Sequence, residues 1–247
     1  INLSMNPEIP DDCDLLFLYA PTSDITDDEK TIIEKYLSDG GKVYLILGDT
    51  TSDTPNLDGI MSDYGLKKVS GYIADTQRCY QGNYYAIFPQ LSLSGDLGSG
   101  ISNQMVLLLN SPGMEKTDTD NDNLTVTPFM QTSDSGYAVT ENDQTQGQYI
   151  LGAVSTNAIS ADSSDSDSED EDDKSDATDT DTKTARLTVL ASASMISSDI
   201  TDQLTTLDNL TLFVNSVTEN FDNVNNVAIE AKSLSTCLLY TSPSPRD

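Results

Sequence analysis

The strongest constraint on the fold lies in the first fifty residues, where two apolar runs flank an amphipathic segment. "CDLLFLYAP" (Cys13–Pro21) is a short continuous apolar run closed by a proline, which is typical of a strand buried on both faces. "KVYLIL" (Lys42–Leu47) is a second run of the same kind. Strand, helix and strand in this order predict a right-handed βαβ unit with parallel strands.

The segment between the two runs carries start and stop signals for a helix. Thr26 and Glu29 have the spacing of a capping box. Apolar residues recur at helical spacing and make one face, at Ile32, Ile33, Tyr36 and Leu37. Gly40 or Gly41 can take the left-handed conformation that ends a helix.

The rest of the chain continues the alternation of strands and helices. "PNLDGIMSDYGL" predicts a helix that begins near Asn56 and stops at Gly65. The last helix is predicted at Asn209–Asn220, with an apolar face made of Leu210, Phe213, Val214 and Val217. Strands are predicted at Leu66–Val69, Gly71–Ala74, "YYAIF", Gln104–Asn110, "LTVTPFMQTS", Gly147–Thr156 and Ala185–Ser194. These elements predict an α/β fold with a mainly parallel sheet and helices on both faces.

A very acidic stretch separates the last two predicted strands. Residues 162–181 hold eleven acidic side chains and Lys174, a net charge of −10. Such a stretch cannot bury enough apolar surface to offset the entropy of ordering, so residues 160–184 are predicted to form a disordered insert. Its function is either loose cation binding or none, and a solvated surface loop is the favoured interpretation.

Charge and composition exclude several classes of function. The chain has 12 Lys and Arg against 41 Asp and Glu, a net charge of −29. This charge repels nucleic-acid phosphates and anionic lipid headgroups, so neither is expected as a partner. No apolar run approaches the roughly 20 residues of a membrane-spanning helix.

The sequence contains no histidine, which rules out Ser-His-Asp and Cys-His catalysis and histidine-based metal sites. Cys13 heads an apolar run and is expected to pack as a small buried hydrophobe. Cys79 lies in a polar stretch, and whether the two pair is left open. Outside the last eleven residues the chain has only these two cysteines, which make neither a disulfide framework nor a metal site.

The last eleven residues differ in character from all that precede them. "CLLYTSPSPRD" (Cys237–Asp247) resembles the translation of a sequencing-library adapter, so we exclude it from the fold as an artefact. We therefore expect the natural protein to continue beyond Thr236. The chain opens with Ile1, so the N-terminus is expected to be incomplete as well.

Several stretches together resemble one family. The opening unit is similar to that of GldG-type auxiliary proteins of ABC transporters, also called the ABC-type uncharacterised transport system domain. Its hallmarks correspond to Pro21, Asp24, Ile25, Thr26, Glu29 and Gly40–Lys42. "PNLDGIMSDYGL", "TPFMQTSDSGYA" and "NLTLFVNSVTENF", followed by "VAIEAKSL", resemble later segments of the family. The resemblance spans roughly Ile9–Leu234.

The resemblance implies a single extracytoplasmic α/β domain over residues 1–236, similar to the class I glutamine-amidotransferase-like fold but without its enzymatic equipment. Such a domain lies on the outer face of the bacterial cell membrane, held by transmembrane segments that are absent here. Its partner would be an ABC transporter permease or another membrane subunit, and its function non-catalytic contact with a protein or ligand.

Two other functions were weighed: a carboxylate-dependent enzyme of the amidotransferase-like superfamily, and a cation-binding surface protein. A catalytic member of that superfamily needs a Cys-His-Glu triad, and neither Cys13 nor Cys79 lies on a glycine elbow between a strand and a helix. The sequence therefore predicts no enzyme, no catalytic residue, no cofactor and no metal site.

The carboxyl ends of parallel strands are where such sheets bind ligands. Asp24 follows the first predicted strand, and Asp49 and Thr50 follow the second. These three are the predicted ligand-facing residues, with ordinary turn and capping chemistry as the alternative.

Two polar loops resemble known sites and fail at the specific positions. "DTDNDNLTVTPF" begins like a calcium loop, but Asn123 and Phe129 stand where glycine and glutamate are needed, so a polar hairpin loop is predicted. "SGDLGSG" (Ser94–Gly100) lacks the Lys-Ser/Thr of a phosphate loop and is predicted to be a flexible loop.

Overall fold

The computed structural model describes residue 3 and residues 7–48, 53–159 and 183–221. Residues 160–182 of the predicted insert and the adapter-like residues 237–247 lie outside the described residues. Lys183 and Thr184 do not belong to the insert, because they pair with Ile159 and Ala158 in the sheet. The acidic stretch therefore joins two neighbouring antiparallel strands, and its predicted disorder stays a prediction.

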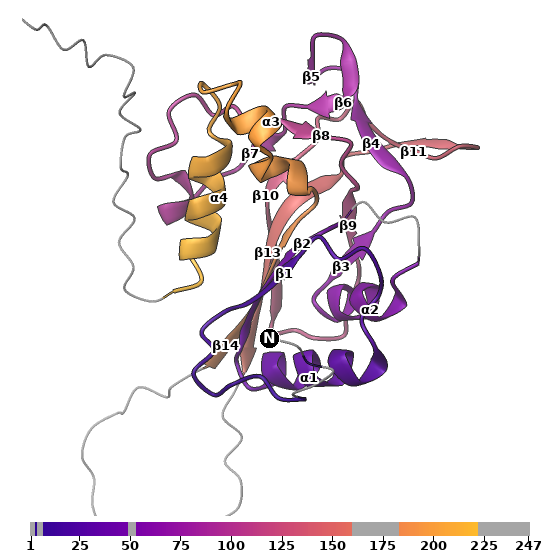
Figure 1. Ribbon diagram of the computed structural model, residues 1–247. Helices are drawn as coiled ribbons and strands as arrows, with labels where there is room; N and C mark the ends of the chain where they lie inside the picture. Colours follow the sequence, from indigo (N-terminus) through magenta and orange to yellow (C-terminus); the bar gives the residue numbers. More distant parts are fainter. Residues whose placement is uncertain (1–2, 4–6, 49–52, 160–182, 222–247) are drawn as a thin grey trace, which may run out of the picture.

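A central eight-stranded sheet organises the molecule (Figure 1). Its main path runs in the order β1 (Leu16–Tyr19), β2 (Lys42–Ile46), β14 (Lys183–Leu190), β13 (Ile150–Ile159), β10 (Leu124–Gln131) and β7 (Gln90–Leu91). Off this path, β9 (Met114–Lys116) pairs with both β13 and β3 (Leu66–Lys68).

The sheet is mixed, which corrects the predicted mainly parallel sheet. β1 and β2 are parallel, with Leu16 opposite Val43, and so are β2 and β14. All other pairings in the sheet are antiparallel, including the long β10–β13 and β13–β14 ladders. The prediction failed because an apolar run reports that a strand is buried, and burial does not reveal the direction of its partner. The fold is thus α/β with a mixed sheet, and its likeness to glutamine amidotransferases stays a prediction.

The predicted βαβ unit is confirmed in detail. Thr26 and Glu29 form a complete capping box at the start of α1 (Asp27–Ser38), each side chain accepting from the other's backbone N–H. Gly40 ends the helix with a φ of 92°, which L side chains rarely adopt. The second predicted helix is α2 (Pro55–Asp63), and Gly65 follows it with a φ of 72°. Local sequence signals therefore predict where both helices end, and for α1 also where it begins.

Helices cover both faces of the sheet, as predicted. Figure 1 shows α4 (Asn209–Thr218) on one side of the sheet and α1 and α2 on the other. Tyr44 of β2 is fully buried under α4, and its ring packs edge-on against Phe213. On the other face, Ile33 and Leu37 of α1 join the same hydrophobic core. The short helix α3 (Ser198–Thr201) precedes α4.

The face that α4 presents to the core differs from the predicted one. Leu210 and Val214 were predicted to face inward, yet each is 50% exposed. The residues of α4 that are buried are Asn209, Leu212, Asn215 and Ser216. The reason is that amide side chains bond distant backbone groups, which helical periodicity of apolar residues cannot reveal.

Two small antiparallel sheets extend the molecule at one end (Figure 1). One contains β12 (Gln144–Gln146), β11 (Gly136–Val139) and β4 (Tyr72–Asp75), in that order. The other contains β5 (Cys79–Tyr80), β6 (Asn83–Ile87) and β8 (Leu108–Leu109). The strand predicted at Gln104–Asn110 is thus only two residues long, because the preceding loop bonds to α4 instead of to a strand.

Candidate functional site

Asp24, predicted to face a ligand after β1, caps a helix. Its Oδ2 accepts from the backbone N–H of Asn56 at 2.8 Å and its Oδ1 from that of Leu57 at 3.1 Å. These N–H groups belong to the first turn of α2, where a negative charge is favoured by the helix dipole. The N-cap residue itself, Thr54, makes no side-chain cap bond. Asp24, which is distant in the chain, therefore caps α2 in place of Thr54, and this agrees with capping chemistry, the alternative to a ligand-facing role.

The first described residues after β1 and β2 lie against each other at Pro21 and Gly48. A Cβ added to Gly48 would come within 2.4 Å of the backbone oxygen of Pro21. Only glycine permits this approach, so the two strand ends are closed at this point. Asp49 and Thr50 lie outside the described residues, and their predicted ligand-facing role stays a prediction.

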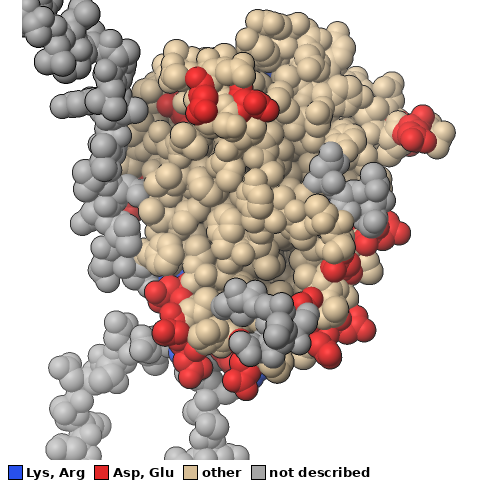
Figure 2. Space-filling view, viewed as in Figure 1, with Lys and Arg blue, Asp and Glu red and all other residues tan. Residues whose placement is uncertain are grey.

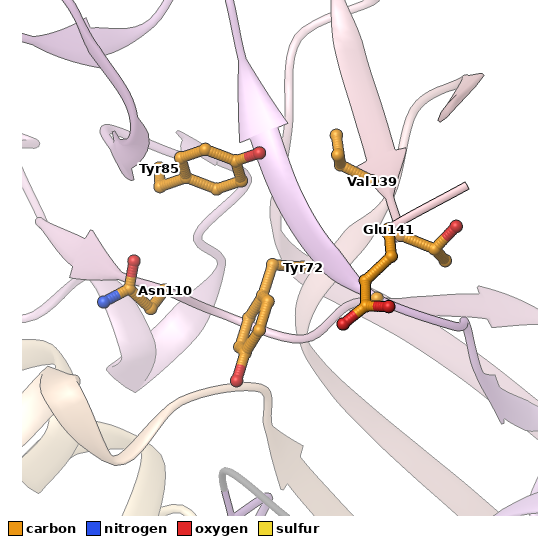
Figure 3. A pocket seen from close by; sticks show the side chains of 7 residues that line it. Tyr72, Tyr85, Asn110, Val139 and Glu141 are labelled. Atoms are coloured by element: carbon orange, nitrogen blue, oxygen red, sulfur yellow. The ribbon is translucent and has the colours of Figure 1, made fainter. Parts of the chain in front are cut away.

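A groove of about 570 Å³ opens elsewhere, between the two small sheets (Figure 3). It is lined by Gly71 and Tyr72 before and in β4, Tyr85 of β6, Asn110 after β8, and Val139, Thr140 and Glu141 at the end of β11. In Figure 3 the ring of Tyr72 stands between Asn110 and Glu141, with Tyr85 above. The groove thus combines two aromatic rings with one amide and one carboxylate.

Backbone packing fixes one wall of the groove. Gly71 has a φ of 86°, and a Cβ there would lie 2.1 Å from the backbone oxygen of Val139. This close approach holds the start of β4 against the end of β11, where the two strands pair through Tyr72 and Val139. Any larger residue at position 71 would push Tyr72 away from Glu141.

A buried carboxylate fixes the other end of the same strand pair. Asp75 is fully buried, and its oxygens accept from the N–H and hydroxyl of Ser133 and from the N–H groups of Gln77 and Arg78. Burial alone would raise the pKa of Asp75, but these hydrogen bonds stabilise the carboxylate and hold its pKa below the ordinary value. Because its hydrogen bonds are all internal to the fold, Asp75 is a structural anchor beneath the groove.

The side chains that line the groove could bind a ligand or a protein partner. Aromatic faces, an amide and a carboxylate can stack on and hydrogen-bond a ligand or a partner's side chains. The sequence does not reveal this groove, because its lining comes from separate segments that lie in loops and at strand ends. "YYAIF" predicts only a strand, and nothing in the sequence separates Tyr85, in the groove, from Tyr84, which is 50% exposed and outside it.

The described residues hold no cluster of metal ligands and no disulfide between Cys13 and Cys79. No cluster of three or more Asp, Glu, Cys or His side chains could hold a metal ion there. Cys13 and Cys79 are both free thiols. The calcium-like loop joins β9 and β10, which do not pair with each other, so it is not the predicted hairpin loop. Its Asn121 instead turns inward to bond Asn157.

The glycine-rich run Ser94–Gly100 is not the predicted flexible loop. Gly95–Gly98 forms a 3-10 turn with Leu97 buried. Asn215 of α4 donates to the carbonyls of Leu97 and Ser99 at 3.0 and 2.7 Å. The run is therefore a structural turn bound to the last helix.

Charge is unevenly spread over the face shown in Figure 2. Acidic side chains gather at the end where α1 lies, while a broad central area shows no charge. Among the described residues, no helix combines the length and apolarity that crossing a bilayer requires.

Comparisons with known proteins identify a family and solved structures of similar fold. The model of the family described as "ABC-type uncharacterized transport system" matches residues 1–229. No match was found among curated proteins. A solved structure described as "mmIFT52 N-terminal domain" is similar with a TM-score of 0.53 at 13% identity, over 86% of this chain and 79% of that chain. Similarity at this level of identity concerns the fold alone.

Proposed function

Because the chain belongs to the family described as ABC-type uncharacterized transport system, we propose that it is a non-catalytic auxiliary domain that works on the outer face of the cell membrane. The family match, which covers residues 1–229, is the observation that carries this proposal. The resemblance found in the opening βαβ unit, from Pro21 to Lys42, points the same way. The partner would be the permease of the transporter.

The groove at Tyr72 is the contact surface that we assign to this function. Its two tyrosines supply large, rigid contact area at a low cost in side-chain entropy, as aromatic residues do at many interfaces. Glu141 adds a negative charge at the rim. A protein segment with apolar and basic side chains would fit such a surface.

The competing enzyme hypothesis gains no support from two carboxylates whose hydrogen bonds the structure defines, Asp75 and Asp24. Asp75 is held by four hydrogen-bond donors from its own fold, and Asp24 caps α2. A general acid or base must be free to reach a substrate proton. Neither carboxylate is placed to do so.

Site-specific photo-crosslinking tests the contact surface. A benzoylphenylalanine replaces Tyr72 in the groove, or Tyr84 on the other small sheet as the control outside the groove, in cells that hold the transporter encoded with this protein. We expect an adduct with the permease from position 72 and a several-fold weaker one from position 84. Equal adducts, or none with any transporter subunit, would contradict the proposed surface.

Labelling with a membrane-impermeant maleimide tests the location. In intact cells, Tyr84→Cys should be labelled as completely as after lysis, because Tyr84 is 50% exposed. Peptide mass spectrometry reads the label at position 84 separately from Cys13 and Cys79. Labelling that requires lysis would place the domain inside the cell and refute the extracytoplasmic proposal.

A further inference from the structure

The rim of the groove at Tyr72 carries negative charge only. Glu141 is the one charged side chain among the described residues that line the groove, and Asp143 lies in the same turn. No Lys or Arg lines the groove, and no ion pair between described residues includes Glu141 or Asp143. A carboxylate with no partner of opposite charge attracts a cation from outside. The charge of the groove therefore favours a basic ligand.

Hydrogen bonds fix the turn that carries Glu141. The N–H of Thr140 donates to the carbonyl of Asp143 at 2.9 Å, and the N–H of Asp143 donates to Oγ1 of Thr140 at 3.0 Å. These bonds close the hairpin of β11 and β12, in which Val139 pairs with Gln144. Glu141 thus stands on a defined backbone at the rim, with its side chain exposed.

The aromatic ring nearest to this turn is that of Tyr72. Tyr72 pairs with Val139 in the β4–β11 ladder, and Glu141 follows Val139 by two residues. In Figure 3 the ring of Tyr72 stands between Glu141 and Asn110. Tyr72 is 36% exposed, so part of its side chain is open to a ligand in the groove.

The side of the groove away from Glu141 is held by an uncommon backbone conformation. Asn110 has a φ of 44°, in the left-handed region that asparagine enters more readily than most residues. Its N–H donates to the carbonyl of Tyr85 at 3.0 Å, which joins the two residues on one side of the groove (Figure 3). Backbone held in such a conformation is found preferentially at binding sites and active sites.

A guanidinium group matches this set of side chains. Its planar face stacks on aromatic rings, and its N–H groups donate to carboxylate and amide oxygens in a fixed fork. A lysine ammonium supplies the charge but has no flat face. A neutral sugar can stack on tyrosine rings as well, but it gains little from a rim whose charge is all negative.

We propose that the groove recognises an arginine side chain that projects from the partner. The guanidinium group stacks on Tyr72 and donates to Glu141, while Tyr85 and Asn110 line the other side. This inference deepens the proposed function and rests on it for the identity of the partner, because the chemistry of the groove names a side chain and not a protein.

Titration of the whole chain with a small arginine probe tests this recognition. The probe is acetyl-arginine methylamide, and its binding is followed through the ¹H–¹⁵N shifts of the backbone amides that line the groove. We expect saturable shifts at Tyr72, Asn110 and Glu141, with a dissociation constant in the millimolar range. Acetyl-citrulline methylamide, in which a neutral urea replaces the guanidinium group, should bind about five-fold more weakly.

Two variants identify the contacts, each with a matched control. Glu141→Gln should weaken binding of the arginine probe about three- to five-fold. Asp122→Asn removes an exposed carboxylate outside the groove, changes the net charge equally and should leave binding unchanged. Tyr72→Leu should weaken binding by a similar factor, whereas Tyr84→Leu should not, and Tyr72→Phe keeps the ring face and should bind nearly as the parent does. Unchanged shifts outside the groove show that each variant is folded.

Equal binding of the arginine and citrulline probes would refute the proposal, as would equal effects of Glu141→Gln and Asp122→Asn. Saturable shifts of the same amides with maltose, and none with the arginine probe, would assign the groove to a carbohydrate instead. An arginine preference without a permease adduct from position 72 would support this recognition and overturn the proposed partner. An adduct without an arginine preference would support the proposed contact surface and overturn this inference.

Discussion

Helices α1 and α4 lie on opposite faces of the same sheet and are held there by different interactions. α1 buries Ile33 and Leu37 and turns its charged residues to solvent. α4 buries Asn209, Asn215 and Ser216 beside Leu212 and leaves Leu210 and Val214 half exposed. One helix follows the ordinary amphipathic pattern, and the other partly inverts it.

The difference reflects what each helix must hold. α1 packs against strands of the sheet and against helix α2, which are regular elements that pair most of their own backbone groups, so apolar contact is sufficient. α4 also holds the long irregular segment between β7 and β8, whose backbone groups need partners. Asn209 accepts from the N–H of Leu107 and donates to its carbonyl and to that of Met195. Asp208, just before the helix, accepts from the N–H groups of Ser102, Asn103 and Met105.

The largest effect should come from the apolar contact of α1. Ile33→Ala removes a fully buried side chain and should lower the free energy of unfolding by about 3 kcal/mol, since the surroundings cannot fill the cavity. Urea unfolding measures this, with the exposed Thr31→Ala as control. A loss under about 1 kcal/mol would show that α1 is not held by its apolar face.

The next effect tests the polar contacts of α4. Asn209→Ala leaves the N–H and carbonyl of Leu107 without their partner and should cost about 2 kcal/mol. Thr211→Ala, a less buried position on the same helix, should cost little. In the Asn209→Ala variant, the amide of Leu107 should also exchange faster than in the parent. If Asn209→Ala is neutral, the buried amides do not hold α4.

A smaller effect separates the two helix starts. Thr26→Ala breaks the capping box of α1 and should cost about 1 kcal/mol, while Thr26→Ser keeps the accepting oxygen and should be nearly neutral. Asp208, at the start of α4, makes no such cap bond. Thermal unfolding compares the variants, and equal melting temperatures for Thr26→Ala and Thr26→Ser would exclude a role for the capping box.

The smallest effect appears only at high pH. Burial raises the pKa of Tyr36 on α1 to about 12, and its hydroxyl donates to the carbonyl of Cys13. The folded state thus favours the protonated phenol, so this contribution is complete below pH 10 and is lost as the pH rises toward 12. At pH 10.5 the loss should be no more than about 0.5 kcal/mol, because the side chain is partly exposed.

Tyr36→Phe should remove this part of the pH dependence. Tyr44, under α4, is more deeply buried, and burial raises its pKa further. Tyr44→Phe should therefore flatten the alkaline stability profile more than Tyr36→Phe does. The opposite order in urea unfolding between pH 9 and 11 would contradict this assignment of burial.

Local signals in the sequence predicted local structure well. The Thr26–Glu29 capping box and the glycine stop at Gly40 are confirmed, because each depends on residues close in the chain, and the parallel pairing of β1 with β2 is confirmed because a helical crossover joins the two strands. The antiparallel half of the sheet was predicted wrongly because an apolar run does not reveal the direction of its partner strand, and the inward face of α4 because its polar partners are distant in the chain. Asn209 and Leu107 are one such pair.

The candidate site shows the same limit. The sequence predicts Asp24 to face a ligand, with helix capping as the alternative, and only the structure shows that the first turn of α2 bonds both of its oxygens. The groove at Tyr72 and Tyr85 could not be predicted. No short sequence motif links the lining residues of β4, β6 and β11. Adjacent residues of the same type, such as Tyr84 beside Tyr85, differ from them only in the direction of the side chain.

The central claim is that buried amide side chains hold α4 to the irregular segment between β7 and β8. Asn215→Ala, measured by urea unfolding, tests it most directly, because the Asn215 amide donates to the carbonyls of Leu97 and Ser99 at 3.0 and 2.7 Å. If the claim is right, the variant should lose about 2 kcal/mol of unfolding free energy, since these carbonyls are left without their donor. A loss under about 0.5 kcal/mol would contradict it.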